Sequence, residues 1–223
     1  MSHSYGDIPC SVERFWHILD KLDRDQKREI TTFGLGCMLY IRPIKMRPSL
    51  IQFLVQNYDA RDQCLRFGPG REIHFTYDDV EDIMGLSKAF GPVLEPVESI
   101  TPYELPRSFE FSYGPAGFRI DSLVTEMRTH DTTGDDFIKR FVLVMLGTVL
   151  APVSQEYVPL SYYGFVSDIR LMRKTSWNMV TLDFLKNSLT KFKDGGKQES
   201  SYPSHWPPGN LALLQIPNQK NHL

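Results

Sequence analysis

An apolar segment in the second half of the chain, Phe137 to Leu150, constrains the fold more than any other feature. Beyond its first turn the residues are apolar almost all round a helix, so neighbours must cover every side of it. The apolar run Phe141 to Val153 is shorter than the about 20 residues that span a bilayer. We therefore predict a central buried helix that starts at Asp135 or Asp136 and ends at Pro152, and no membrane association.

Apolar residues recur at intervals of three and four in several other segments, which predicts a mainly helical domain. One surface helix has Ser11 as its N-cap, and another begins at Pro48 and is expected to bury Leu50, Phe53 and Leu54. Later helices are expected from Ile120, from about Ser161 to Met172, and from near Ser176.

A β-hairpin is predicted between residues 64 and 75, where apolar residues alternate in CLRF and EIHF around a Gly-Pro-Gly turn. A short helix follows, with Thr76 as its cap, an acidic stretch from Asp78 to Asp82 and Gly85 as its end. The Pro-rich stretch 86–119 is expected to pack its aromatic residues on the core. The fold class predicted is mainly α: an irregular helical domain with one small β-hairpin.

The length of 223 residues suits one domain with short appendages. Apolar residues make up 41% and charged residues 23%, which excludes a chain that is disordered throughout. We expect a flexible N-terminus at 1–10, a helical domain at 11–193, and a Gly/Ser/Pro-rich loop with a C-terminal segment at 194–223. Three unclustered cysteines and an N-terminus without an apolar run indicate an intracellular protein.

The net charge of -2 gives no overall basic excess for nucleic-acid binding. Three local basic stretches leave such binding open if the fold brings them side by side: Arg42, Lys45 and Arg47; Arg170, Arg173 and Lys174; and Lys186, Lys191 and Lys193. A simpler explanation of these basic residues is that they lie on a solvated surface or interact favourably with the C-terminal ends of helix dipoles.

Chemistry-bearing patterns are sparse. The sequence has no CxxC, HExxH, GxSxG, GxxxxGK[ST] or GxGxxG motif, and no lysine is marked for pyridoxal chemistry. His74 with Asp78 and Asp82 is the one group that suggests a metal ion, and Cys64, His74 and Asp78 form the one triad that can be drawn. Ordinary surface roles explain both better, so we predict no catalytic, cofactor-binding or metal-binding residue, and no enzyme.

Four stretches occur in an order that carries a family resemblance: GLGCMLYIRPIKMRPSLIQFLVQNYDARDQCLRF, GREIHFTYDDVEDIMGL, DDFIKRFVLVMLGTVLAPVSQEYVPLSYYGFVSDI followed by Trp177 and TLDFLKNSLTKF, and GNLALLQI. Together they resemble the plant mobile domain family ("aminotransferase-like, plant mobile domain"), in the form found in grass transposon-associated proteins. The match covers about residues 12–216. The chain departs from the family after Ile216, where it looks truncated.

The resemblance implies a transposon-derived nuclear protein without catalysis that associates with a protein or chromatin partner, which the sequence does not identify. Truncation would leave an apolar groove uncovered and favour self-association. Two alternatives stay open. The chain is an accessory segment of a transposase or of a ubiquitin-like-protein cysteine protease polyprotein, with its catalytic domain elsewhere, or it is a small hydrolase that uses Cys64 and His74.

Overall fold

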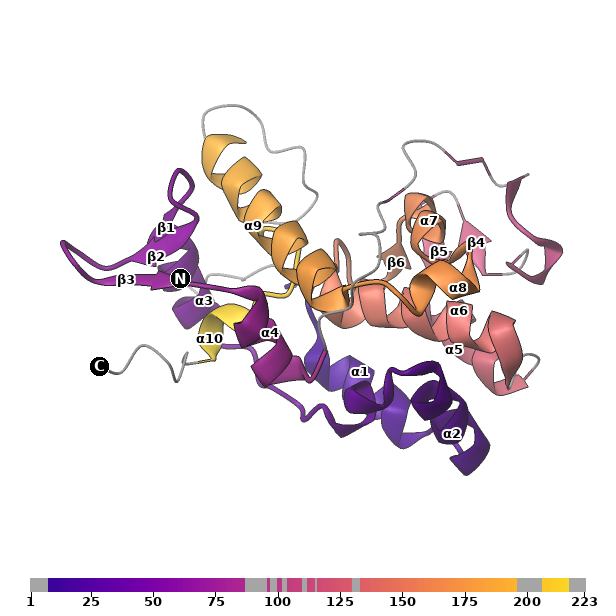
Figure 1. Cartoon of the computed structure of the whole chain (residues 1–223). Coiled ribbons are helices and arrows are strands. Elements are labelled where there is room, and N and C mark those ends of the chain that lie inside the picture. The colour runs from indigo at the N-terminus through magenta and orange to yellow at the C-terminus, as the bar shows by residue number, and fades with distance from the viewer. Residues whose placement is uncertain are drawn as a thin grey trace, which may run out of the picture.

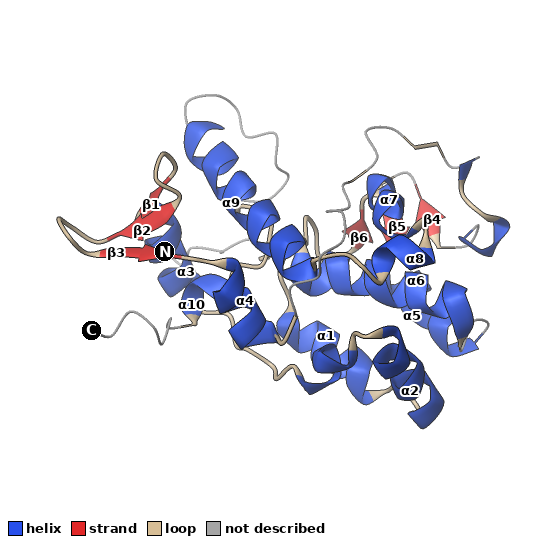
Figure 2. Ribbon diagram, viewed as in Figure 1, coloured by secondary structure: helices blue, strands red, loops and turns tan. Residues whose placement is uncertain are grey.

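The computed structural model describes residues 8–86, 96, 100–101, 104–109, 112–114, 116–129, 133–195 and 206–216. Helices dominate these residues, as predicted (Figures 1 and 2). They are α1 (Val12–Asp20), α2 (Arg24–Phe33), α3 (Pro48–Gln56), α4 (Tyr77–Met84), α5 (Ile120–Thr129), α6 (Gly134–Met145), α7 (Tyr163–Val166), α8 (Ile169–Met172), α9 (Trp177–Gly195) and α10 (Ala212–Gln215). Short 3-10 turns cover Gly36–Tyr40, Arg107–Phe109 and Leu160–Tyr162.

The predicted central helix is confirmed as α6, which continues into a π-helical turn at Leu146–Leu150. Every residue from Phe141 to Ala151 is buried. Helices α2, α5 and α7 pack on α6, while α1 and α9 pack on the π-helical turn (Figure 1). Within the described ranges, no helix has both the length and the apolar character that crossing a membrane requires.

The π-helical turn fixes the start of α1 to the core. A π turn holds one residue more than an α turn, which displaces a carbonyl from the regular ladder. The Thr148 carbonyl accepts a hydrogen bond from the Ser11 N–H at 2.9 Å. The Ser11 hydroxyl in turn accepts from the Arg14 N–H, so Ser11 is the N-cap of α1, as predicted.

Two small antiparallel sheets lie at opposite ends of the molecule (Figure 2). The first contains β1 (Tyr58–Asp59), β2 (Cys64–Arg66) and β3 (Glu72–His74), so the predicted hairpin is confirmed as β2–β3. The second contains β4 (Tyr113–Gly114), β5 (Gly117–Arg119) and β6 (Tyr157–Val158). Strand β1 and the second sheet were not predicted, because β1, β4 and β6 have two residues each, which is too few to show alternation.

Two helix predictions need correction. Helix α3 buries Ile51, Leu54 and Val55, whereas Phe53 is 50% exposed and stacks on Phe67 at a ring distance of 5.8 Å. The expected single helix from Ser161 to Met172 is broken into a 3-10 turn, α7 and α8. The break falls before Asp168, whose carboxylate caps α8 by accepting from the backbone of Arg170 and Leu171.

The domain body extends beyond the predicted range 11–193. Ile8 and Cys10, inside the segment expected to be flexible, are buried in the core, and α9 continues to Gly195. Residues 206–214 are also buried, so the described part of the expected C-terminal loop and tail is packed. Residues 1–7, 196–205 and 217–223 lie outside the described ones.

The expected packing of stretch 86–119 on the core is confirmed for Phe109 and Phe118, which are fully buried. Their rings meet edge to face at 5.8 Å. Phe90, Tyr103 and Phe111 lie outside the described residues.

A buried ion pair ties this stretch to the helices. Arg140 on α6 is 1% exposed and its Nε donates to a carboxylate oxygen of Glu126 on α5 at 2.8 Å. The Ser112 hydroxyl donates to the same oxygen at 2.6 Å, and the Ser108 carbonyl accepts from Arg140. The guanidinium also lies 4.5 Å from the centre of the Phe109 ring. The Arg140–Glu126 pair therefore holds α5, α6, Ser108 and Ser112 together.

Replacing Arg140 with methionine should lower the free energy of unfolding by about 3–5 kcal/mol, because Glu126 would be left buried without its cation. The matched control is Arg128→Met, which removes an exposed arginine on α5 and should change stability by less than about 0.5 kcal/mol. Urea unfolding measures both. Equal effects of the two substitutions would contradict a structural role for the buried pair.

The turn between β4 and β5 generates a second prediction. Gly117 has φ +129°, and a Cβ there would lie 2.2 Å from the Val158 carbonyl oxygen. Gly117→Ala should therefore cost about 3 kcal/mol or more of stability. Gly114, its partner across the strands, has open space around a Cβ, so Gly114→Ala should change the melting temperature little. Comparable melting temperatures for the two variants would refute the close approach.

Candidate functional site

A groove of about 760 Å³ opens between segments that are far apart in the sequence. Its size lies in the range typical of ligand pockets. Its walls come from α1, the segment after the first 3-10 turn, α4, the π-helical turn and the C-terminal segment. The lining residues are Val12, Tyr40, Ile41, Arg42, Ile44, Asp79, Asp82, Ile83, Met84, Val149, Asn210, Ala212, Leu213 and Ile216.

Helix α4 supplies the acidic wall of the groove. Its start is fixed by a capping box: the Thr76 hydroxyl accepts from the Asp79 N–H, and the Asp79 carboxylate accepts from the Thr76 N–H at 2.7 Å. Asp79 and Asp82 are three residues apart and therefore share a face, which lines the groove. The helix ends at Gly85, where φ is +69° and a Cβ would lie 2.9 Å from Cys37.

A second wall of the groove comes from Tyr40, Ile41, Arg42 and Ile44. The first 3-10 turn, Gly36–Tyr40, leads into this wall. Tyr40 is 84% exposed although it lines the groove, and Ile41 and Ile44 are half-buried. Arg42, which belongs to the first basic stretch, lies on the same wall. The groove thus combines an exposed aromatic ring, aliphatic side chains and charges of both signs.

A buried amide forms part of the groove lining. Asn210 is buried and hydrogen-bonds to two sulfur atoms: its Oδ1 accepts from the Cys10 thiol and its Nδ2 donates to the Met84 sulfur, both at 3.5 Å. Sulfur is a weak hydrogen-bonding partner, so the amide keeps much of its capacity to bind a stronger one. Burial raises the pKa of the Cys10 thiol to about 12.

Backbone contacts hold the C-terminal wall in place. The Gly209 N–H donates to the Pro152 carbonyl at 2.8 Å, and the Gln215 side chain accepts from the Arg47 N–H at 2.8 Å. Gly209 has φ +109°, and a Cβ there would lie 3.1 Å from Leu185 on α9. Residues 209–216 are therefore bound to the end of the central helix, to α9 and to the start of α3.

The three basic stretches do not form one surface. Arg42 lines the groove, and the Arg173 guanidinium lies 4.9 Å from the centre of the Phe33 ring. Lys193 donates to the Gln56 carbonyl at 2.8 Å. Arg173 precedes α9 and Lys193 lies in its last turn, so the 19 residues of the helix, about 28 Å long, separate them.

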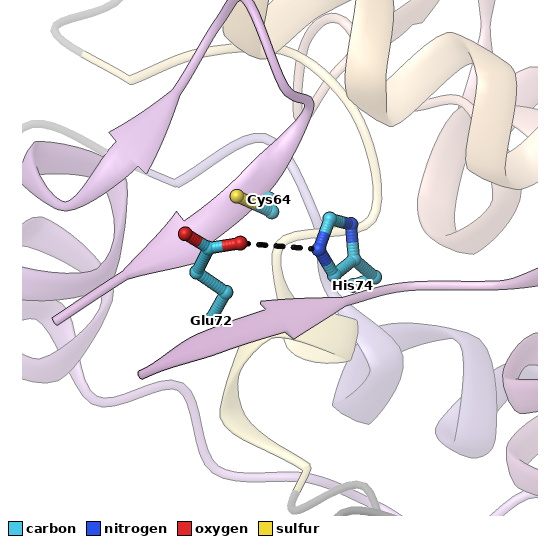
Figure 3. A group of neighbouring side chains, drawn as sticks. All are labelled: Cys64, Glu72 and His74. Carbon is cyan, nitrogen blue, oxygen red and sulfur yellow. Dashed lines mark ion pairs between the residues drawn. The ribbon is translucent and has the colours of Figure 1, made fainter. Parts of the chain in front are cut away.

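The structure groups the candidate metal-binding and catalytic residues differently from the sequence-based expectation. Cys64 and His74 are directly opposite each other in β2 and β3, and their third neighbour is Glu72, not Asp78 or Asp82 (Figure 3). The ligand atoms of Cys64, Glu72 and His74 lie within 4.8 Å of one another. Among the described residues, no other group of three such side chains is this close, and Asp82 instead lines the groove.

The environment of Cys64 differs from that of a nucleophile. Burial raises the pKa of its thiol, whereas reactive cysteines have lowered pKa values. No hydrogen bond joins the thiol to the His74 ring in the described part of the chain. The His74 Nε2 instead lies 3.6 Å from a carboxylate oxygen of Glu72.

Sequence reasoning missed three residues of these sites: Tyr40, Asn210 and Glu72. A signal existed for Glu72, because residues two apart in a strand share a face and Glu72 precedes His74 by two. None existed for Tyr40 or Asn210, since their places depend on packing between remote segments.

Comparison with known families gives one match. A family model described as a domain of unknown function, DUF8566, matches residues 8–205. No curated protein and no solved structure matches the chain. The matched range includes every wall of the groove except the C-terminal segment.

The buried thiol beside the groove predicts a pH dependence. The Cys10 pKa is raised from 9.0 to about 12, so the folded state keeps a proton that the unfolded chain releases above pH 9. Wild-type stability should therefore fall between pH 9 and 12, with a contribution from Cys10 of up to roughly 4 kcal/mol. Cys10→Ala should flatten this fall in chemical unfolding measured across the window. An unchanged slope would show that the thiol is not shielded as described.

Proposed function

The chain belongs to the DUF8566 family, a domain of unknown function, and we propose that it is a non-enzymatic module that binds a short basic segment of a partner protein in its groove. The observation that carries the proposal is that the exposed Tyr40 ring and the exposed Asp82 of α4 line the same groove of about 760 Å³.

The apolar lining supports a peptide ligand. Tyrosine is enriched at protein interfaces, where it buries a large ring while its hydroxyl stays hydrogen-bonded. Tyr40 stands 84% exposed at the groove, while Ile83 is half-buried and Leu213 is buried. An apolar side chain of a partner would cover Tyr40 and contact Ile83, which removes apolar surface from water.

The charges of the groove favour a basic partner over nucleic acid. Asp82 is exposed in the lining, and Asp78 and Glu81 lie on the same helix, so carboxylates outnumber the lining cation Arg42. Carboxylates attract lysine or arginine and repel phosphate. Arg173 and Lys193 lie at opposite ends of α9, so the second and third basic stretches are not gathered at one point.

The resemblance to the plant mobile domain family supports a place in the nucleus and a transposon origin. Chromatin proteins offer basic segments of the kind that the groove charges favour, so chromatin association fits the same chemistry. The hydrolase alternative receives no support from the Cys64 thiol, whose pKa is raised rather than lowered.

Selection from a random peptide library displayed on phage tests this function directly. We expect enriched peptides with lysine or arginine next to large apolar residues. Tyr40→Ala should weaken their binding by about tenfold or more, as for an interface hot spot. Phe53→Ala, which removes an exposed ring outside the groove, is the matched control and should leave binding unchanged.

The acidic wall has its own variant pair. Asp82→Asn should weaken the selected peptides and reduce the salt dependence of their binding, while Asp78→Asn, on the same helix but outside the lining, should do so less. The groove would be refuted as a recognition site if no peptide is enriched. It would also be refuted if neither Tyr40→Ala nor Asp82→Asn changes the affinity of the selected peptides.

A further inference from the structure

The hairpin at the other side of α3 carries a cluster that the groove does not use. We propose that Cys64, Glu72 and His74 bind a zinc ion on one face of the β2–β3 hairpin (Figure 3). This site is independent of the groove. It replaces the expectation of no metal site, because the register supplies a third ligand, Glu72, that the sequence reading left out.

The strand register brings the three side chains together. Cys64 pairs with His74 and Arg66 pairs with Glu72, while the Phe67 N–H donates to the Arg71 carbonyl. Hydrogen-bonded and non-hydrogen-bonded pairs alternate in an antiparallel ladder, so Cys64 and His74 form a non-hydrogen-bonded pair, in which side chains are closest. Glu72 lies two residues before His74 and therefore shares its face.

The distances are close to those that zinc needs. The ligand atoms lie within 4.8 Å of one another, and the His74 Nε2 is 3.6 Å from a Glu72 oxygen. Tetrahedral zinc with usual bond lengths places its ligand atoms about 3.3–3.6 Å apart. The side chains of Glu72 and His74 are 33% and 58% exposed and are therefore free to rotate. Small rotations would bring their ligand atoms to zinc-binding distance from the buried Cys64 sulfur.

Arg66 positions the carboxylate of this cluster. Its Nη1 contacts the Oε1 of Glu72 at 2.6 Å, which leaves Oε2 directed at His74 (Figure 3). The same guanidinium pairs with Asp59 at 3.0 Å and with Asp62. Three carboxylates thus surround one arginine, and the resulting excess of negative charge favours a divalent cation.

The ligand types select the metal. A thiolate, an imidazole and a carboxylate suit zinc, whereas magnesium and calcium take oxygen ligands. Water would complete the fourth position, since His74 faces solvent. The thiol must lose its proton to bind zinc, so zinc affinity should increase with pH.

The test titrates the untagged full chain with Zn²⁺ by calorimetry and with Co²⁺ as a spectroscopic probe. We expect one metal per chain, with a thiolate-to-cobalt charge-transfer band in the near ultraviolet that Cys64→Ser abolishes. Cys37→Ser and His17→Gln remove a cysteine and a histidine outside the cluster and should leave the band and the affinity unchanged.

If Cys64→Ser does not fold, Glu72→Gln and His74→Gln test the zinc site instead. Both side chains are partly exposed, so these substitutions should leave the fold intact. Each should weaken zinc binding by at least about tenfold, since loss of even an outer partner of a ligand has that effect. No stoichiometric binding, or binding that these variants do not weaken, would overturn the site. Peptide binding in the groove should not depend on zinc. A failure of the zinc site therefore leaves the proposed peptide-binding function standing, and the reverse also holds.

Discussion

Burial of the helix formed by α6 and its π-helical turn is the constraint on which the rest of the structure depends. A helix that is apolar on every side requires a complete shell, and α1, α2, α5, α7 and α9 provide it. The fit is close: a Cβ at Gly147 would lie 2.4 Å from the Val158 side chain, which brings the second sheet onto the helix. Arg140, the fully buried cation of this helix, is retained because Glu126 neutralises it.

The groove is a consequence of this shell. The π-helical turn contributes Val149 to the lining and fixes the start of α1 through the Ser11–Thr148 hydrogen bond. The C-terminal segment is held to the same helix end by the Gly209–Pro152 hydrogen bond. These hydrogen bonds hold lining residues from remote segments against the same helix end, which would favour recognition without large rearrangement on binding.

The features that were predictable from sequence are those with local causes. The buried helix follows from apolar residues on all its sides, α4 from the Thr76–Asp79 box and Gly85, and the hairpin from alternation around Gly-Pro-Gly. Helix α2 went unnoticed because it buries few residues, among them the polar Gln26. The groove and the contact between Cys64 and Glu72 depend on tertiary packing and strand register, which a composition or spacing argument does not fix. The family resemblance to plant mobile domains stays a prediction.

Amide hydrogen exchange with and without a selected basic peptide tests the central claim most directly, namely that the groove is the recognition surface. The account predicts that added protection is confined to residues 40–44, to α4 and to residues 210–216, with none on the β2–β3 hairpin. Protection concentrated on the hairpin, on α8 or along the lysines of α9, with the groove segments unchanged, would contradict it.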